Sequence, residues 1–115
     1  MKKIYHLKTC STNQRILGDL NLEGVTLQEI KTQGITEDQI DEMAKLAGSY
    51  EALFSRKAMK YKSMGLKDKN LSEDDYRQLI LDEYTFLKRP VALVEGQIFI
   101  GNAKSSVEAL KEALL

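Results

Sequence analysis

The 115-residue sequence predicts an α/β fold in which a βαβ unit and a ββα unit share one mixed four-stranded sheet. Three observations predict it. Apolar segments near the start follow the order strand, helix, strand; those near the end follow strand, strand, helix; and helix-capping residues recur between them. This length suits one domain, so we expect residues 1–115 to form a single domain with a helical insertion at about 34–88.

The βαβ unit is predicted over residues 2–30. Lys2–Leu7 is rich in residues that favour strands, and a polar stretch of helix N-cap types follows it. Gln14–Leu20 then has apolar residues at helical spacing. Val25–Ile30 alternates apolar with polar residues, which predicts a second strand with Leu27 on its apolar face.

The middle of the chain is predicted to be helical. Thr36 and Gln39 form a capping box, which predicts a helix that ends at Gly48. A short helical piece follows from Ser49, whereas residues 56–70 carry many lysines and few apolar residues and are expected to be mostly loop. A second capping box, Ser72 with Asp75, starts another helix in which Leu79, Ile80 and Tyr84 are expected to pack.

The C-terminal third predicts the ββα unit. Val91–Val94 and Gln97–Ile100 are expected strands joined by a tight turn at Glu95-Gly96. Ser105 with Glu108 is a further capping box and predicts a last helix. A parallel βαβ unit joined to an antiparallel hairpin and a helix is the thioredoxin-like arrangement.

Composition and charge narrow the function classes. Apolar residues make up 43% of the chain, and 17 basic residues balance 17 acidic ones, so we expect no direct nucleic-acid binding. No apolar run approaches the roughly 20 residues that a membrane span needs, so we expect no membrane association. The first residues lack the long apolar stretch of a secretory signal, which favours a cytoplasmic location.

Cys10 is the candidate reactive group, because it stands between the first strand and the first helix. Unpaired N–H groups and the positive end of the helix dipole favour an anion there, so the pKa of its thiol should lie below about 8.5. Its polar neighbours argue against the alternative, an inert buried cysteine. The N–H groups of Ser11, Thr12 and Asn13 could bind an oxyanion at the same place.

A single cysteine limits the chemistry. It cannot form an internal disulfide or a cysteine-rich zinc site, and we expect no metal. Asn13 stands where a CxxC motif has its second sulfur, so a redox cycle through Cys10 needs an outside thiol such as glutathione or a partner protein. His6 either lies near the thiolate, which it would favour when protonated, or points toward a helix.

Arg89 directly precedes Pro90, the one proline, at the start of the third strand. In a thioredoxin-like arrangement this junction faces the loop after the first strand, so the guanidinium could hold a tetrahedral oxyanion beside Cys10. The alternative is a surface arginine beside a structural proline. A peptide bond to proline at such a junction is also a candidate for the cis form.

Residues 4–12 (IYHLKTCST) resemble the opening of the glutaredoxin-coupled arsenate reductase (ArsC) family, together with its Spx and YffB-like relatives. The resemblance extends to residues 53–57, 61–66 and 87–91, and so covers almost the whole chain. It implies a thioredoxin-like fold with a helical insertion. It also implies that a cysteine attacks arsenate, that glutathione displaces the product, and that glutaredoxin recycles the mixed disulfide.

Carried onto matching positions, the resemblance implies Cys10 as the nucleophile, His6 as an aid to its ionisation, and Arg56 and Arg89 as oxyanion-binding groups. Two positions depart from the family pattern. The reductases have a third arginine after the last strand, where this chain has Gly101–Lys104, and the CxxC switch of Spx is interrupted by Asn13. Asn102 or Lys104 could only partly replace a bidentate donor.

Three functions therefore stay open. The first is a glutathione- and glutaredoxin-dependent thiol reductase acting on arsenate or a related small oxidised substrate, with no bound cofactor and glutathione as co-substrate. The second is an Spx-like binding module that docks on RNA polymerase without catalysis. The third is a glutathione-handling protein whose substrate is the thiol of another protein.

Overall fold

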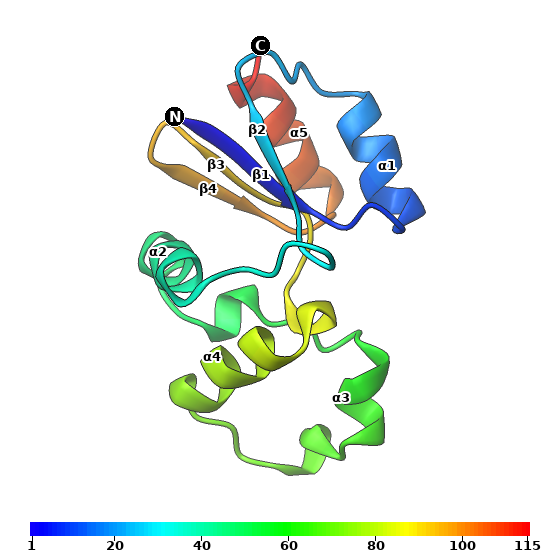
Figure 1. The fold of residues 1–115 in the computed structure, drawn as a ribbon, viewed down its shortest axis with the longest axis vertical. Coiled ribbons are helices and arrows are strands. Elements are labelled where there is room, and N and C mark those ends of the chain that lie inside the picture. Colours follow the sequence, from blue (N-terminus) through cyan, green and yellow to red (C-terminus); the bar gives the residue numbers. More distant parts are fainter. The chain divides into compact units, whose positions relative to one another are not determined.

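Four strands and five α-helices make up the computed structural model, which describes residues 1–115 (Figure 1). Its contacts divide the chain into one unit of residues 1–33 with 89–115 and a second unit of residues 34–88. The second unit has the boundaries expected for the helical insertion; that the two units form a single domain stays a prediction. None of the helices has the length and apolar character needed to cross a bilayer.

The first unit is built on a mixed sheet with the strand order β2-β1-β3-β4. Its strands are β1 (Lys2–His6), β2 (Thr26–Glu29), β3 (Val91–Val94) and β4 (Gln97–Ile100). The central strand β1 pairs in parallel with β2 and antiparallel with β3, and β3 pairs antiparallel with β4. The predicted mixed four-stranded sheet is confirmed.

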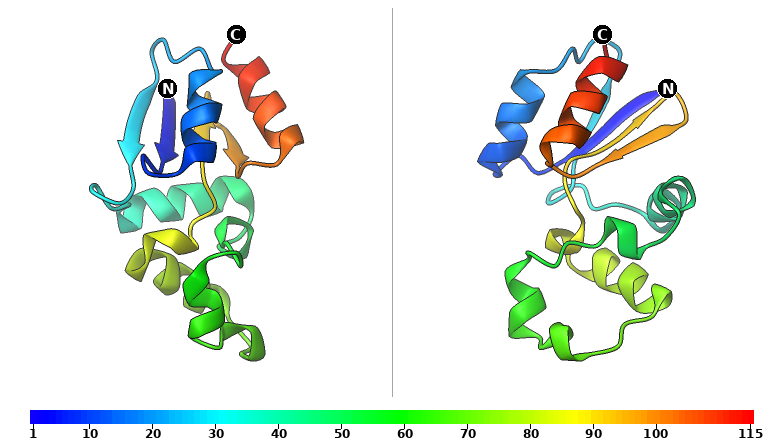
Figure 2. Two further views of the ribbon diagram at one scale, coloured as in Figure 1. Left: turned by 90° about the vertical axis from the view of Figure 1, so that its right-hand side faces the viewer. Right: turned by 180° about the vertical axis from the view of Figure 1, so that it is seen from behind.

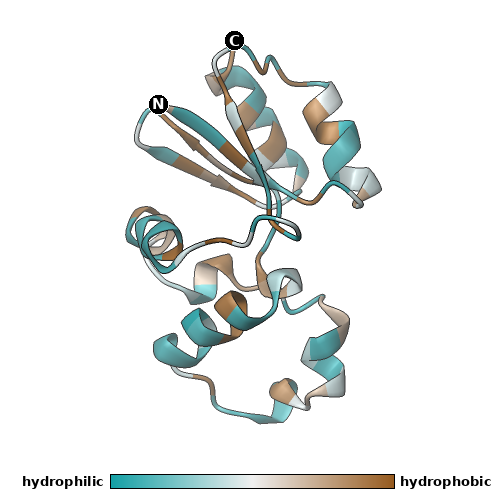
Figure 3. Cartoon of the chain, in the orientation of Figure 1, coloured by the Kyte–Doolittle hydropathy of each residue, from teal (hydrophilic) through white to brown (hydrophobic).

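Two helices, α1 (Ser11–Gly18) and α5 (Lys104–Ala113), cover the same face of this sheet (Figure 2). The apolar core beneath them combines strand and helix residues: Ile4, Ala92, Val94, Leu110 and Leu114. The strand β3 is buried along its whole length and is coloured as hydrophobic in Figure 3. Such continuous burial is expected of a strand in the middle of a sheet.

The turn between β3 and β4 is as predicted. Glu95 and Gly96 both have positive φ, 48° and 82°, which is the backbone of the tight two-residue hairpin turn. Glycine takes that conformation without strain from a Cβ atom.

The start of α1 differs from the prediction. The helix begins at Ser11 instead of Gln14, and Cys10 is its N-cap, with extended backbone. The Gln14 N–H donates to the Cys10 carbonyl at 3.0 Å, which closes the first helical turn. The polar residues expected to precede the helix therefore form its first turn, where their short side chains are tolerated.

The predicted apolar face of the second strand was wrong. Leu27 is 42% exposed, whereas Gln28 is 2% exposed. The Gln28 side-chain amide donates to the Gln33 carbonyl at 3.2 Å, and this bond offsets the cost of burying a polar group. Because β2 lies at the edge of the sheet, one side of this strand has no neighbouring strand, and the Leu27 side chain can remain partly in solvent.

The second unit contains α2 (Glu37–Ala47), α3 (Met59–Ser63) and α4 (Glu73–Asp82). Both predicted capping boxes, Thr36 with Gln39 and Ser72 with Asp75, are confirmed. The expected loop at residues 56–70 is wrong in part, because it holds α3 and a short 3-10 helix with a buried leucine. Helix α4 ends before Tyr84, which lies in the next 3-10 helix.

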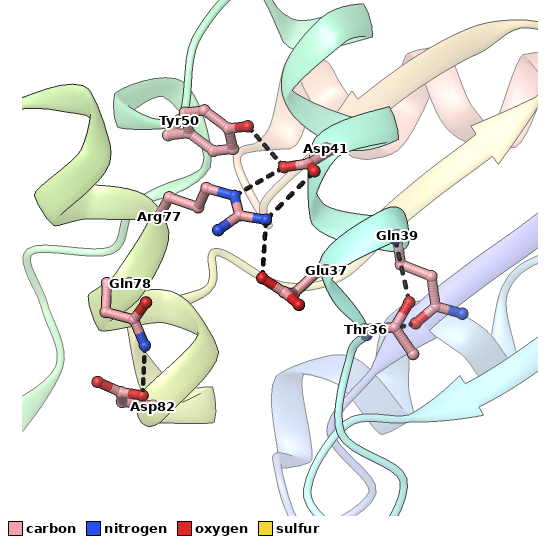
Figure 4. A network of polar contacts seen from close by, with 8 residues as sticks. All are labelled: Thr36, Glu37, Gln39, Asp41, Tyr50, Arg77, Gln78 and Asp82. Atoms are coloured by element: carbon pink, nitrogen blue, oxygen red, sulfur yellow. Dashed lines mark hydrogen bonds and ion pairs between the residues drawn. The ribbon is translucent and has the colours of Figure 1, made fainter.

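A polar network joins α2 to α4 within this unit (Figure 4). The Arg77 guanidinium on α4 donates to both Asp41 carboxylate oxygens, at 2.8 and 3.2 Å, and to Glu37 at 3.2 Å. The Tyr50 hydroxyl donates to Asp41 at 2.6 Å. This two-oxygen geometry fixes the helices' relative rotation more firmly than a single contact would.

The predicted capping box at Ser105 is also wrong. Helix α5 starts at Lys104, two residues before the start that a Ser105 cap would give, and its N-cap is Ala103, which has no capping side chain. Ser105 therefore lies inside the helix. The apolar face of this helix, with Leu110 and Leu114, is buried as predicted.

We predict that Leu110→Ala lowers the free energy of unfolding by about 3 kcal/mol, because it removes buried methyl groups and leaves a cavity beneath the sheet. Leu110 is 2% exposed, and urea unfolding followed by circular dichroism measures the change. Leu115→Ala is the control, because Leu115 is 90% exposed. Equal stabilities of the two variants would contradict this account of the core.

Candidate active site

Cys10 lies where the chain passes from β1 into α1. Its N–H donates to the Leu7 carbonyl at 3.1 Å, which makes a tight turn between the strand and the helix. The cysteine is free and half-buried. The sulfur thus lies at the start of α1, as predicted, where N–H groups have no partner within the helix.

Several groups act on the ionisation of this thiol. Burial by itself raises the pKa of Cys10, but hydrogen bonds from the main-chain N–H groups of Asn13 and Thr12 lower it. The charge of Arg89 and a hydrogen bond from its side chain lower it further. The net result is a pKa below the ordinary value for cysteine, so the thiolate forms at a lower pH than it does in an ordinary cysteine.

Arg89 acts on Cys10 from the other end of the sequence. It is half-buried, and its peptide bond to the buried Pro90 is cis. The Pro90 carbonyl accepts a hydrogen bond from the Gly101 N–H at 2.8 Å, so the segment after β4 starts beside this junction. The structure brings Arg89 and Cys10 together, as the thioredoxin-like arrangement predicts.

The three residues after Cys10 are placed differently from one another. Ser11 is exposed, Thr12 is half-buried, and the Asn13 side chain is 1% exposed. The Asn13 Oδ1 accepts a hydrogen bond from the Leu7 N–H at 3.0 Å. A ligand at this place would therefore meet the main-chain N–H of Asn13 and not its amide group. Oxyanion binding by these residues stays a prediction.

His6 ends β1 and pairs in register with Glu29 of β2. Burial lowers the pKa of His6, and the nearby Glu29 carboxylate opposes this effect only in part. The imidazole is therefore mainly uncharged at neutral pH, and its Nδ1 is buried without a hydrogen-bond partner. The groups that lower the pKa of Cys10 do not include it. A role of His6 in ionising Cys10 stays a prediction.

Arg56 belongs to the second unit. Its guanidinium is exposed, pairs with Glu51 at 2.7 Å and donates to the Tyr76 hydroxyl at 3.0 Å. It also lies 5.8 Å from the centre of the Tyr76 ring. These contacts account for its orientation within that unit, and its part in binding an oxyanion stays a prediction.

Two residues that brace the cysteine loop were not predicted. The Glu29 carboxylate accepts from the Lys8 N–H at 2.9 Å and also from Lys31 and Thr32. The Gln14 side chain donates to the Lys8 carbonyl. The position of Glu29 at the end of the parallel neighbour of β1 is the sequence feature that points to such a contact, because parallel strands end at the same edge.

The arrangement suits nucleophilic attack on an anion. It combines a sulfur of lowered pKa, main-chain donors and a guanidinium, which are the parts that stabilise a thiolate and an incoming oxyanion. No three His, Cys, Asp or Glu side chains lie close enough together to hold a metal ion.

We predict that iodoacetamide alkylates Cys10 with a pH midpoint below about 8.5, the value of a free cysteine thiol. The reason is that the Asn13 and Thr12 N–H groups and Arg89 favour the thiolate. Initial rates between pH 5 and 10 give the midpoint, with unfolded protein as the reference. A midpoint at or above that of the unfolded protein would overturn the assignment of Cys10 as a reactive thiolate.

We predict that Glu29→Gln lowers the free energy of unfolding by about 1 kcal/mol at pH 7, because it weakens the charge-assisted bonds to Lys8, Lys31 and Thr32. These bonds lower the pKa of Glu29 from 4.5 to about 2, although burial opposes them. The stabilisation is therefore complete above about pH 4.5 and disappears as the pH falls toward 2. Urea unfolding at pH 7 and pH 3 should show a smaller difference at pH 3; an unchanged difference would refute the brace.

Comparison with known proteins agrees with this geometry. The ArsC family model matches residues 5–110. An arsenate reductase of Neisseria meningitidis is 26% identical over 113 residues, which cover 94% of this chain and 96% of the relative. The Escherichia coli protein YfgD is 28% identical over 109 residues, which cover 91% of this chain and 92% of that protein.

Solved structures agree on the fold. An arsenate reductase from Vibrio cholerae has a TM-score of 0.78 at 21% identity, and the match covers 99% of this chain and 97% of that one. A YffB protein has a TM-score of 0.81 at 19% identity over 100% of both chains. These likenesses confirm the thioredoxin-like fold. Because the family model spans nearly all of the sequence, the chain belongs to the ArsC family.

Proposed function

We propose that this ArsC-family protein is a glutathione- and glutaredoxin-dependent thiol reductase that uses Cys10 to reduce arsenate or a related small oxyanion. The observation that carries the proposal is the place of Cys10 as the N-cap of α1, where the Asn13 and Thr12 N–H groups and Arg89 act on its sulfur and lower its pKa. Two relatives, both from Neisseria meningitidis, are named arsenate reductase, which supports a thiol reductase of this class.

The proposed reaction starts with attack of the Cys10 thiolate on the arsenic atom, with loss of one oxygen as water. A glutathione thiol then supplies the second sulfur. The arsenic accepts two electrons and leaves as arsenite, while the two sulfurs join as a mixed disulfide between Cys10 and glutathione. In sum, arsenate and two thiols give arsenite, water and one disulfide.

An outside thiol is required to complete the cycle, because the chain has no second cysteine. Glutaredoxin, or another glutathione, would attack the glutathione sulfur of the mixed disulfide and release the Cys10 thiolate. The half-buried position of Cys10 at the start of a helix is compatible with this approach.

Oxyanion binding would use Arg89 and the N–H groups of the first turn of α1. A guanidinium can hold two oxygens of a tetrahedral anion at once, and helix-start N–H groups favour negative charge. The segment after β4 offers the exposed Lys104 in place of a third arginine. A single ammonium holds two oxygens of an anion less firmly than a guanidinium does. The proposed substrate class therefore includes oxyanions other than arsenate.

We predict that the protein reduces arsenate in an assay coupled through glutathione, glutaredoxin and glutathione reductase, and that Cys10→Ser abolishes turnover. Arg89→Lys should lower kcat/KM by about 10- to 100-fold, because one charge-assisted bond of a two-point contact is lost. Arg15→Lys, on the exposed side of α1, is the matched control and should not change the rate.

Absence of turnover with the unsubstituted protein would overturn arsenate as the substrate and favour the binding module. Turnover that survives in Cys10→Ser would overturn the cysteine mechanism itself. Docking on RNA polymerase, action on the thiol of another protein, and a cytoplasmic location stay predictions.

A further inference from the structure

Asn13 is a polar side chain in an almost fully buried position. It is 1% exposed and lies in the first turn of α1. Its Oδ1 accepts the Leu7 N–H at 3.0 Å, and its Nδ2 is buried without a hydrogen-bond partner. Burying an amide with half of its capacity unused costs stability compared with an apolar residue. The hydrogen bond that Oδ1 accepts, and not apolar packing, therefore explains why an asparagine occupies this buried position.

Through this hydrogen bond, Asn13 Oδ1 holds the segment that carries the cysteine. Leu7 donates its N–H to Asn13 and accepts the Cys10 N–H on its carbonyl at 3.1 Å. The main-chain N–H of Asn13 in turn donates to the Cys10 sulfur. One residue thus contacts both ends of the segment from Leu7 to Cys10, through its side chain at one end and its backbone at the other.

We propose that Asn13 is a positioning residue for Cys10, and that its side chain ties Leu7 to the first turn of α1 so that the sulfur stays within reach of the N–H groups of that turn. The Asn13 amide does not itself touch a substrate, because almost none of its surface is exposed. Its effect on catalysis rests on the proposed function, but its effect on the thiol does not.

A second bond across the loop does not replace this one. The Gln14 side chain donates to the Lys8 carbonyl from an exposed position, where water competes for the same groups. The Asn13 to Leu7 bond is buried, and its loss would leave the Leu7 N–H without a partner away from water. The loop is therefore expected to move when Asn13 is truncated.

We predict that Asn13→Ala raises the midpoint of the Cys10 thiol titration by about one pH unit, which corresponds to a tenfold lower thiolate fraction well below the midpoint. Thiolate absorbance at 240 nm against pH gives the midpoint in the folded protein. Amide hydrogen exchange of Leu7 should become faster in the same variant. In the coupled arsenate assay the pH–rate profile should shift upward by the same amount, with activity recovered at higher pH.

The matched control is Asn21→Ala. Asn21 lies beyond the other end of α1, where its side chain donates to the Leu114 carbonyl at 3.1 Å and accepts the Glu23 N–H at 3.2 Å. The Asn21→Ala substitution therefore removes comparable side-chain hydrogen bonds from the same unit and leaves the cysteine loop unchanged. Its titration midpoint should equal that of the unsubstituted protein.

An unchanged midpoint in Asn13→Ala, or an equal rise in Asn21→Ala, would overturn the positioning role. Asn13→Ser is the second variant in case the alanine variant does not fold, because a hydroxyl leaves a smaller cavity yet is one bond too short to reach Leu7. This test can be told apart from the test of the proposed function. If Asn13→Ala has a raised midpoint but the unsubstituted protein does not reduce arsenate, the role of Asn13 is supported and arsenate is refuted as the substrate.

Discussion

The contact on which the site depends is that between the Cys10 sulfur and the first N–H groups of α1. A helix start offers donors that have no partner inside the helix, and here two of them face a half-buried thiol. Burial alone would raise the pKa of that thiol. The balance is reversed because the donors and Arg89 act together, and the net effect is a lowered pKa.

The fold supplies what this contact needs by placing fixed elements on every side of the loop. The central strand β1 delivers the chain to the sheet edge, and its parallel neighbour β2 ends beside it with Glu29. The junction before β3 brings Arg89 to the same edge from 79 residues further along the chain. The site is therefore a property of the mixed sheet, in which a parallel and an antiparallel neighbour flank one strand.

Sequence patterns were sufficient to predict the four strands of a mixed sheet, the capping boxes of α2 and α4, and a cysteine at the start of a helix. They did not predict where α1 begins, since Ser, Thr and Asn are equally suited to the cap and to the first turn. The buried face of β2 was misjudged, because a glutamine with a satisfied amide occupied an inward position. The predicted capping box at Ser105 was wrong for a related reason: its residues are of the types that cap helices, but α5 starts before them.

The braces of the site were beyond prediction for a different reason. Glu29 and Gln14 contribute through side-chain contacts with the backbone of Lys8, which is distant in sequence from Glu29 and belongs to no helix or strand pattern. The Arg56 assignment came from resemblance, and the local contacts of Arg56 with Glu51 and Tyr76 are ordinary for an exposed arginine. Patterns identify the candidate cysteine, and contacts between elements decide how its loop is held.

The lone sulfur has a kinetic consequence for the proposed chemistry. A protein with a neighbouring thiol can leave its oxidised state by a first-order internal exchange, at a rate independent of its surroundings. With a buried amide at that position, release becomes a bimolecular event whose frequency scales with the concentration of the second thiol. The lifetime of the oxidised protein would then report the reducing capacity of its environment directly, with no internal step to buffer it.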